Sequence, residues 1–368
     1  MGNKVGVITH WWAKDNYGQK LQAYALQIVL RNLGYDPFLI RYITDGGHQE
    51  CSERMCAFYS LKAYVKYRIK QVLLLFDKDR KKRMQEFIRT QLSVSHKLYT
   101  RYSIFKFPPE ADFYITGSDQ VWNKLDGSYF LDFVKNGNPR ISYAASFGGR
   151  NYTAQEAEYV KSWLKKFSSI SVREKEGLIL CDRLGILNSE LVPDPTLLLE
   201  EKEYKNFFTG SVNHRSPYLF LYLLGHECDF DAQQVYDFAK KHNLEVVYVI
   251  SQGEQDSFPK AYPTVPQWLE LLSNARYVVT NSFHGMVFSL IFERNFISVP
   301  LSGKAGKMND RQRTLLTHTN LVHRFTNDCD MLLEDISFIE VKGTLEKLRK
   351  EGLNFLENSL EDSGSSVV

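Results

Sequence analysis

The chain has 368 residues, of which 43% are hydrophobic and 24% are charged, and its formal net charge is +3. This composition excludes a disordered chain, and so small a positive charge gives no reason to expect binding to nucleic acid. A chain of this length predicts two domains, each large enough to bury a hydrophobic core of its own.

The chain begins with a strand–helix–strand pattern. Residues 5–9 are a short β-branched run, which predicts a buried strand. Residues 18–33 place their apolar side chains on one face of a helix, and Gly34 is suited to end it. A second apolar run at 37–42 completes a βαβ unit, so we expect a parallel sheet.

A helical, basic pattern at residues 60–90 is open to two interpretations. It is typical of an amphipathic helix with one solvated face, and it would also suit attraction to an anionic membrane surface. Strands and helices alternate after it, with strands predicted at 112–117, 140–148 and 169–172 and helices at 153–167 and 173–185. Two prolines within 192–199 interrupt this pattern, so we predict a first domain at 1–199.

The alternation restarts at residue 218. Its predicted strands are 218–225, 244–251, 276–282 and 295–300, and its predicted helices are 230–242, 265–275 and 284–292. We therefore predict a second domain at 200–335, a helix at 336–360 that packs back onto the first domain, and a disordered tail at 361–368. The fold class that follows is α/β, with two Rossmann-like domains facing a cleft.

The cysteines and the amino terminus indicate a cytoplasmic protein. The five cysteines are odd in number, and the Cys51 and Cys56 pair has no matching second pair, which argues against a zinc site. Unpaired thiols are typical of a reducing compartment. We find no signal peptide pattern and no apolar stretch of the roughly 20 residues that a membrane span needs, so we expect at most peripheral membrane contact.

Polar residues and glycines follow five of the predicted strands. They stand in the segments "THWWAKDNYG", "GSDQVWN", "SFGG", "RE" and "TNSFHG". Ligands of open α/β sheets bind beyond the carboxyl ends of the strands, so these segments together predict a site between the two domains.

Residues 281–285 lie between the end of the strand predicted at 276–282 and the start of the helix predicted at 284–292. Asn281 and Ser282 stand where a helix cap is expected, His284 lies in the first turn, and Gly285 would let a ligand or backbone come close. One interpretation is an anion site at the helix amino terminus. The other is a capped helix whose histidine makes a structural hydrogen bond, and the spacing does not choose between them.

Three other places offer charged side chains with two interpretations each. Arg173 could hold a phosphate or carboxylate, or could form a surface pair with Glu174. Asp119 could orient a hydroxyl, although a turn-forming role is the simpler interpretation. The segment 302–313 is basic and rich in glycine but lacks the P-loop pattern, so it is either a lid or a solvated loop.

The motifs, taken in order, resemble those of polysaccharide pyruvyl transferases. They are "NYGQKLQAYALQIVLRNLGY", "GSDQVWN", "YFLDFV", "RISYAASFG", "SVREKEG", "VPDPTLLL", "TNSFHGMVFSLIF" and "NDRQRTLL", and they span about residues 5 to 325. The resemblance implies a fold like that of GT-B glycosyltransferases. It also implies transfer of a pyruvyl group from phosphoenolpyruvate (PEP) to two hydroxyls of a sugar in a cell-surface glycan, with a cyclic ketal as product and without a metal ion or cofactor.

The resemblance also implies roles for individual residues. Some family members carry Arg-Leu-His where this chain has Ser282, Phe283 and His284, so His284 corresponds to the catalytic histidine. Ser282 departs from that pattern, because an arginine that would bind PEP is missing. The donor-binding residues expected from the match are Ser282, Phe283 and Gly285, with Arg173, Arg311, Lys304 and Lys307 as the candidate cations. Those expected to bind the acceptor or shape the cleft are Asn16, Asp119, Gln120 and Trp122.

Two other functions remain open at this stage. A glycosyltransferase that uses a nucleotide sugar would have the same architecture, but "TNSFHG" offers no acid for a ribose. A binding module for anions or glycans would have the same cleft without turnover. The acceptor sugar, its linkage to a lipid and the oligomeric state are not determined by the sequence.

Overall fold

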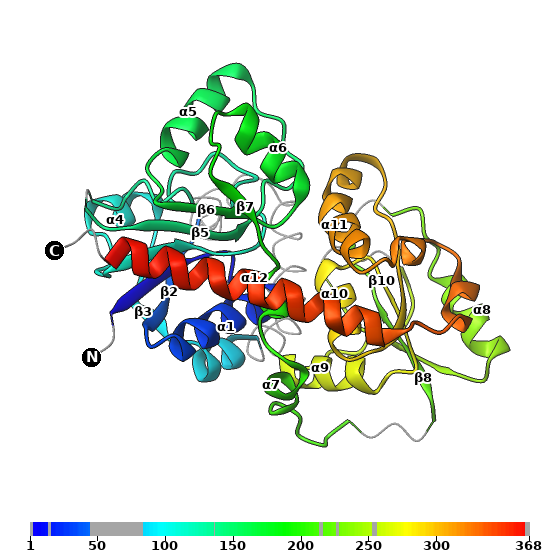
Figure 1. Cartoon of the computed structure of the whole chain (residues 1–368). Helices are drawn as coiled ribbons and strands as arrows, with labels where there is room; N and C mark the ends of the chain where they lie inside the picture. Colours follow the sequence, from blue (N-terminus) through cyan, green and yellow to red (C-terminus); the bar gives the residue numbers. More distant parts are fainter. Residues whose placement is uncertain are drawn as a thin grey trace, which may run out of the picture.

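The computed structural model describes residues 3–13, 16–44, 84–135, 137–212, 216–225, 228–251 and 256–364. Within them the chain forms two lobes, each built on a parallel sheet with helices packed against it (Figure 1). The predicted fold class is confirmed.

The first lobe contains a seven-stranded sheet with the order β3-β2-β1-β4-β5-β6-β7, in which every neighbouring pair is parallel. Its strands are β1 (Lys4–Ile8), β2 (Asp36–Tyr42), β3 (Val94–Tyr99), β4 (Phe113–Thr116), β5 (Arg140–Ala145), β6 (Ser169–Val172) and β7 (Ser189–Leu191). Its helices are α1 (Tyr17–Asn32), α4 (Arg101–Lys106), α5 (Ala154–Leu164) and α6 (Lys175–Arg183). All residues of β4 and β5 are buried, as expected for inner strands covered on both faces.

The second lobe contains a four-stranded parallel sheet with the order β11-β10-β8-β9. Its strands are β8 (Tyr218–Tyr222), β9 (Glu245–Tyr248), β10 (Tyr277–Thr280) and β11 (Asn295–Ser298). Its helices are α8 (Gln233–Lys241), α9 (Val265–Asn274), α10 (Phe283–Ile291) and α11 (Asp310–His318), with the 3-10 segments η3 (Gly303–Asn309), η4 (Val322–Arg324) and η5 (Cys329–Leu333). The segment between the sheets forms η2 (Pro195–Leu197) and α7 (Glu201–Lys205).

The structure differs from the sequence prediction in a few elements. The strands β3 and β7 and the helices α4, α7 and α11 were not predicted, because each is short or lacks a clear hydrophobic period. Of the basic helical pattern at 60–90, residues 84–91 are helical, with Met84, Phe87 and Ile88 buried. Residues 60–83 of that pattern lie outside the described residues.

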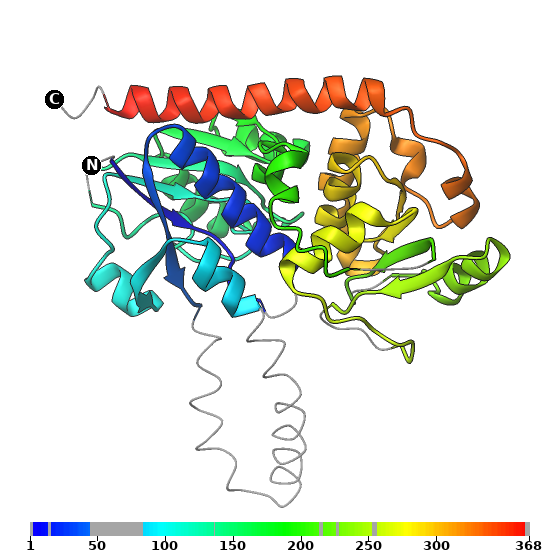
Figure 2. The ribbon, with the colours of Figure 1, turned by 90° about the horizontal axis from the view of Figure 1, so that it is seen from below.

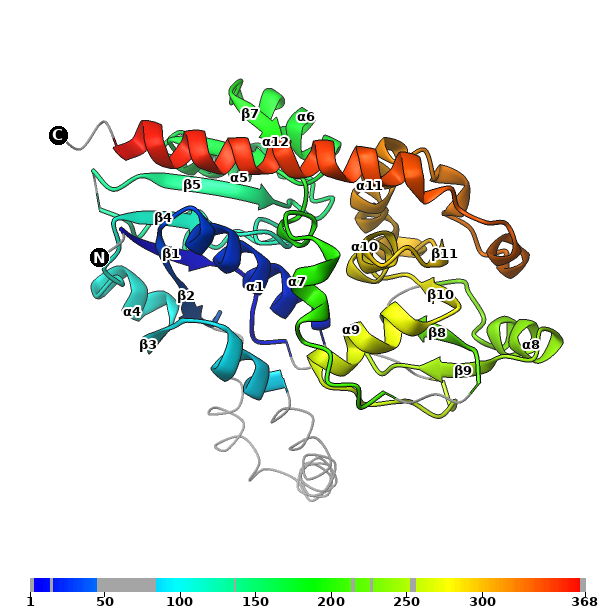
Figure 3. The ribbon, with the colours of Figure 1, turned by 60° about the horizontal axis from the view of Figure 1, so that its bottom comes forward.

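The two lobes are joined by a continuous hydrophobic core. One cluster of buried side chains includes Val5 of β1, Leu198 beside η2 and Phe288 of α10. At the amino end of α1, the ring of Tyr17 stacks on Trp268 of α9, with centroids 5.3 Å apart. Figure 3 shows α1, α7, α9 and α10 meeting along this junction. The packing fixes how the two sheets are placed relative to each other.

The carboxyl-terminal helix α12 (Phe338–Gly364) runs along both lobes (Figures 1 and 2). It continues four residues past the predicted end at residue 360, so 361–364 are helical where the sequence suggested a disordered tail. Residues 365–368 lie outside the described residues. The helix lies close to the first lobe at Gly352, where an added Cβ would stand 2.5 Å from Tyr143 Oη and 2.7 Å from Leu198 Cδ2.

Alanine at two glycines of α12 should have opposite effects on stability. Gly352→Ala should destabilise the protein, because its methyl group would collide with Tyr143 and Leu198. Gly343→Ala, on the same helix with no atom within 4 Å of the added Cβ, should stabilise it by about 0.4–1 kcal/mol. Thermal and urea unfolding measure both changes. Equal behaviour of the two variants would contradict the docking of α12 at Gly352.

Candidate active site

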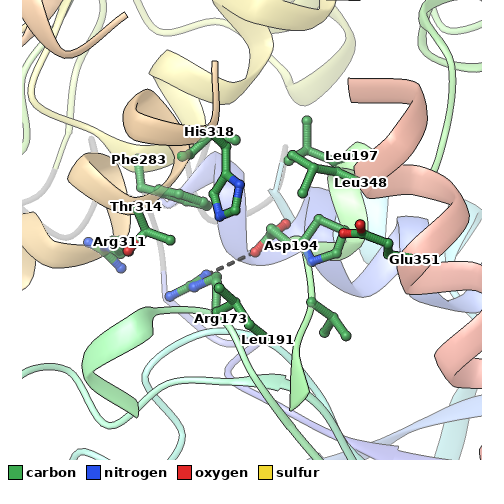
Figure 4. A pocket seen from close by; sticks show the side chains of 13 residues that line it. Arg173, Leu191, Asp194, Leu197, Phe283, Arg311, Thr314, His318, Leu348 and Glu351 are labelled. Atoms are coloured by element: carbon green, nitrogen blue, oxygen red, sulfur yellow. Dashed lines mark hydrogen bonds and ion pairs between the residues drawn. The ribbon is translucent and has the colours of Figure 1, made fainter. Parts of the chain in front are cut away.

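Charged side chains gather where strand ends of the first lobe meet the second lobe. There are seven such side chains. Six of them stand a few residues after the end of a strand, and the seventh, Arg311, belongs to α11. The set is His10, Asp119, Arg173, Glu174, Asp194, His284 and Arg311. Figure 4 shows part of this cluster, with Arg173, Asp194 and Arg311 around one pocket.

The segment before α10 is shaped by local hydrogen bonds. Ser282 caps the helix, and its hydroxyl oxygen accepts a hydrogen bond from the Gly285 amide at 3.3 Å. An added Cβ at Gly285 would stand 2.5 Å from Thr280 Oγ1. Glycine is therefore required there by the approach of β10, and Ser282 is occupied as the cap.

The imidazole of His284 is enclosed by both lobes. Its side chain is 8% exposed, and Nε2 lies 3.6 Å from Asp194 Oδ2. A Cβ added to Gly18 of α1 would stand 2.0 Å from Nδ1 of the same ring. No other residue type than glycine leaves room for the ring at that position. Nε2 itself has no hydrogen-bond partner among the described residues.

Asp194 holds the centre of the cluster. Its carboxylate is fully buried and accepts hydrogen bonds from Ser118 Oγ at 2.6 Å, Arg173 Nη1 at 2.9 Å and the Thr196 hydroxyl at 2.7 Å. Burial acts to raise the pKa of Asp194, but the charges of His284 and Arg173 and the hydrogen bond from Ser118 outweigh it and lower the pKa. Asp194 is therefore an ionised carboxylate shared by an arginine of one lobe and a histidine of the other.

Arg173 is buried but not fully paired. Its Nη2 lies 4.0 Å from Asp119 Oδ1, and neither Nη2 nor Nε has a hydrogen-bond partner among the described residues. The guanidinium carbon lies 4.8 Å from the centre of the Phe283 ring. Two buried donor groups of this side chain thus remain available to an anion.

Arg311 approaches the same aromatic ring from α11. Its guanidinium carbon lies 5.6 Å from the Phe283 centroid, and its Nε is buried without a hydrogen-bond partner. Burial and the charge of Arg173 lower the pKa of Arg311 to about 10, so it stays charged at neutral pH. The two cations therefore sit close enough to repel each other.

A pocket of about 410 Å³ lies beside these two arginines. Arg311, Thr314, Leu315 and His318 line it from one face of α11, and Leu348 and Glu351 line it from α12. The remaining lining residues are Arg173, Leu191, Val192, Pro193, Asp194, Leu197 and Phe283. In the described part of the chain, Arg173 and Arg311, the two arginines predicted to bind the donor, come together at this pocket.

Lys304 and Lys307 lie at a different pocket from the arginines. The sequence grouped all four cations at one donor site, but the lysines line a larger pocket of about 1020 Å³ that shares no residue with the first. Its other lining residues are Asn123, Gly148, Gly149, Arg150, Asn151, Ala305 and Met308. A Cβ on Gly149 would stand 2.7 Å from the Lys307 carbonyl oxygen, so the two lobes touch here as well.

The segment around Asp119 is part of the cluster. Asp119 adopts a φ of 80°, its Oδ2 accepts a hydrogen bond from Gln19 Nε2 at 3.0 Å, and His10 Nδ1 lies 3.4 Å from the same oxygen. Burial acts to raise the pKa of Asp119, but His10 and Arg173 outweigh it and lower the pKa. The left-handed turn of the simpler interpretation is present, and the carboxylate is also buried among polar and charged groups.

The remaining predicted site residues divide between structural and available groups. Asn16 caps α1, since its Oδ1 accepts a hydrogen bond from the Gln19 amide at 3.1 Å. The Trp122 ring lies in the core, stacked on Phe130 at 5.3 Å, so it can shape the loop but not face a sugar. Gln120 keeps a buried Nε2 without a hydrogen-bond partner.

Besides His10, which stood unnamed in the polar segment after the first strand, sequence reasoning missed three residues of the site. Asp194 was assigned to a connector, and Tyr17 and Gly18 belonged to "NYG", a motif too short to be specific. The only signal for Asp194 was a carboxylate between two prolines, in a segment that is otherwise apolar. All three take their roles from contacts between the lobes.

The described residues contain no cluster of histidine, cysteine, aspartate and glutamate that could hold a metal ion. None of the helices within the described ranges combines the length and the apolar content of a membrane span.

This chain is similar to known proteins in its sequence motifs and in its fold. The family model of polysaccharide pyruvyl transferase matches residues 16–303. No curated protein matches the chain.

Solved structures share the fold at low sequence identity. A putative UDP-N-acetylglucosamine 2-epimerase from Listeria monocytogenes is 12% identical with a TM-score of 0.52, over 100% of this chain and 90% of that one. The S. aureus MnaA–UDP structure is 10% identical with a TM-score of 0.50, over 98% of this chain and 97% of that one. At such identities the likeness concerns the GT-B-like fold alone.

Replacing Glu174 by glutamine should remove a pH-dependent loss of stability. Burial raises the pKa of Glu174 above its ordinary 4.5, and the charge of Arg173 opposes this only in part. The folded chain then binds this proton more tightly than the unfolded chain, so wild-type stability should fall as the pH rises from about 4.5 through the folded pKa. In Glu174→Gln the free energy of unfolding, measured in urea between about pH 5 and 8, should lack this fall.

The control is Glu176→Gln, which changes an exposed carboxyl in the first turn of α6. It should keep the wild-type pH dependence. Asp119 and Asp194, whose pKa values are lowered, lose their stabilising effect only at more acidic pH and do not disturb the measurement. Parallel pH profiles for wild type and Glu174→Gln would contradict the interpretation.

Proposed function

Because the chain belongs to the polysaccharide pyruvyl transferase family, as the match over residues 16–303 shows, we propose that it transfers a pyruvyl group from PEP to a sugar of a cell-surface polysaccharide precursor. The observation that carries the proposal is the buried Asp194 carboxylate, which lies 2.9 Å from Arg173 and 3.6 Å from His284. Arg173, a cation suited to the donor, and the ring of His284 thus both lie close to Oδ2 of Asp194.

The reaction defines what the site must supply. The methylene carbon of PEP gains a proton and becomes a methyl group, and its neighbouring carbon loses phosphate. Two sugar hydroxyls form bonds to that carbon, which closes the cyclic ketal. Of the two protons released, one balances the new methyl group and the other leaves with phosphate. A site for this chemistry needs cations for the donor and a group that moves a proton.

We assign the donor to the smaller pocket. PEP carries close to three negative charges at neutral pH, and Arg173 and Arg311 offer buried guanidinium nitrogens without hydrogen-bond partners among the described residues. An anion there would also relieve the repulsion between the two arginines. Arg173 and Arg311 would take the place of the arginine that some family members carry where this chain has Ser282. Phe283 would form the apolar wall of the pocket.

We assign proton transfer to His284. Its Nε2 has no hydrogen-bond partner among the described residues, and Asp194 and Gly18 fix the ring from two sides. A histidine can give and regain a proton near neutral pH, which suits delivery to the methylene carbon. Asp194, which lines the donor pocket and lies 3.6 Å from His284 Nε2, would act as a positioning residue for the ring.

The acceptor would then use the larger pocket. It is lined by the loops after β4 and β5 and by Lys304 and Lys307 from the second lobe. It is the larger and the more open of the two pockets, which suits a sugar better than the smaller pocket does. Lys304 and Lys307 are accordingly proposed as acceptor-side residues.

Replacing His284 by asparagine should reduce phosphate release from PEP by at least about 100-fold, because the proton donor is lost. PEP should still raise the melting temperature of the variant, since its arginines remain. The matched control is His242→Asn, a histidine at the carboxyl end of α8, which should keep wild-type turnover. Undiminished phosphate release in His284→Asn would remove the residue from this role.

Gly18→Ala tests the same role without touching the histidine. The added methyl group would overlap the His284 ring, so the ring must move and turnover should fall while PEP binding is kept. Gly343→Ala, whose added Cβ has no neighbour within 4 Å and which lines neither pocket, serves as the control.

Replacing Arg311 by glutamine should weaken PEP binding roughly tenfold to 100-fold, the usual range for a lost charge-assisted hydrogen bond. Thermal shift titrations with PEP measure the change. The double variant Lys304→Gln and Lys307→Gln should bind PEP as wild type does, because these lysines line the other pocket. If the lysine variant lost PEP binding and Arg311→Gln kept it, the donor assignment would be wrong.

A panel of simple glycosides, incubated with PEP and analysed for phosphate and ketal mass, tests the function as a whole. Stabilisation by UDP-N-acetylglucosamine but not by PEP would favour a glycosyltransferase. Stabilisation by PEP without phosphate release on any glycoside would favour a binding module.

A further inference from the structure

Exposed aromatic and basic side chains gather at the end of β3 and on α4. Tyr102 is 71% exposed, Phe107 57% and Phe105 43%. The Lys106 ammonium lies 5.5 Å from the Tyr102 ring centre and 5.3 Å from that of Phe107. We call Arg101, Tyr102, Phe105, Lys106 and Phe107 the α4 patch, and four of them line an open hollow of about 840 Å³.

The charge around the α4 patch is mainly positive. Residues 94–109 contain no aspartate or glutamate, and Lys97, Arg101 and Lys106 are all exposed, although the exposed Glu110 follows directly. Leu98, next to Lys97, is 50% exposed. Single exposed apolar residues need no explanation, but this group is contiguous and framed by cations.

We propose that the α4 patch docks on the surface of an anionic lipid bilayer. Tyrosine and phenylalanine rings insert at the level of the lipid headgroups, and the lysine and arginine beside them meet the negative phosphates. The helix has only six residues, so the contact is interfacial. A second copy of the chain is a poorer occupant, because two patches of the same positive sign would face each other.

The position of the patch agrees with this role. Helix α4 lies on the part of the first lobe that is far from the second lobe (Figures 1 and 3). Neither pocket of the candidate active site includes a residue of the patch. Docking would therefore leave both pockets uncovered. The inference does not rest on the proposed chemistry, since lipid binding and pyruvyl transfer are measured separately.

The test is co-sedimentation of the full chain with vesicles of phosphatidylcholine alone or mixed equally with phosphatidylglycerol. The wild type should bind the anionic vesicles, and binding should weaken as salt is raised. Tyr102→Ser with Phe107→Ser, and separately Arg101→Gln with Lys106→Gln, should each reduce binding roughly tenfold or more. Thermal melts verify that each variant is folded, and its stabilisation by PEP should match the wild type.

Matched controls use equally exposed residues elsewhere. Leu187→Ser with Ile339→Ser removes apolar side chains that are 78% and 85% exposed, and Lys240→Gln with Lys350→Gln removes two exposed charges. Both controls should bind vesicles as the wild type does. Equal binding to both vesicle types, or wild-type binding by the patch variants, would overturn the proposal. A dimer in sedimentation velocity that the patch variants abolish would overturn it in favour of self-association.

Discussion

The buried carboxylate of Asp194 is the constraint on which the rest of the site depends. A charge removed from water must be compensated by nearby donors and cations, or its burial costs more than the fold can supply. Here Ser118, Thr196 and Arg173 of the first lobe make hydrogen bonds to it, and His284 approaches from the second. His284 Nε2 lies 3.6 Å from the carboxylate because the lobes are packed as they are, so the placement of the lobes also sets the electrostatics of the site.

Close packing at the junction also holds the two lobes in place relative to each other. Tyr17 stacks on Trp268, and Gly18 gives the His284 ring the space that a side chain would occupy. The hydrophobic core continues from one sheet to the other, and α12 covers the junction from one side. A core packed this densely transmits small displacements, which makes the histidine sensitive to residues that never touch a substrate.

The cations are divided between two pockets, so the proposed donor and the proposed acceptor are assigned to different places. Arg173 and Arg311 share one aromatic ring and a small pocket, whereas Lys304 and Lys307 face the loops after β4 and β5. The guanidinium groups suit a small, highly charged molecule that is held from several sides, and the lysines suit a larger ligand in a more open space. With the α4 patch on the far side of the first lobe, donor, acceptor and membrane are proposed to meet three separate surfaces.

The sequence by itself determined the alternation of strands and helices, the two parallel sheets and the strand ends at which polar residues gather. It could do so because hydrophobic period, helix caps and glycine stops are local properties of the chain. It also indicated His284, Arg173 and Arg311 one by one. Only the tertiary structure decided that Asp194 belongs to the site, that Gly18 makes room for the histidine, and that the lysines stand apart from the arginines. These relations join residues far apart in the chain, and no local spacing encodes them, because they arise only when the two lobes pack together.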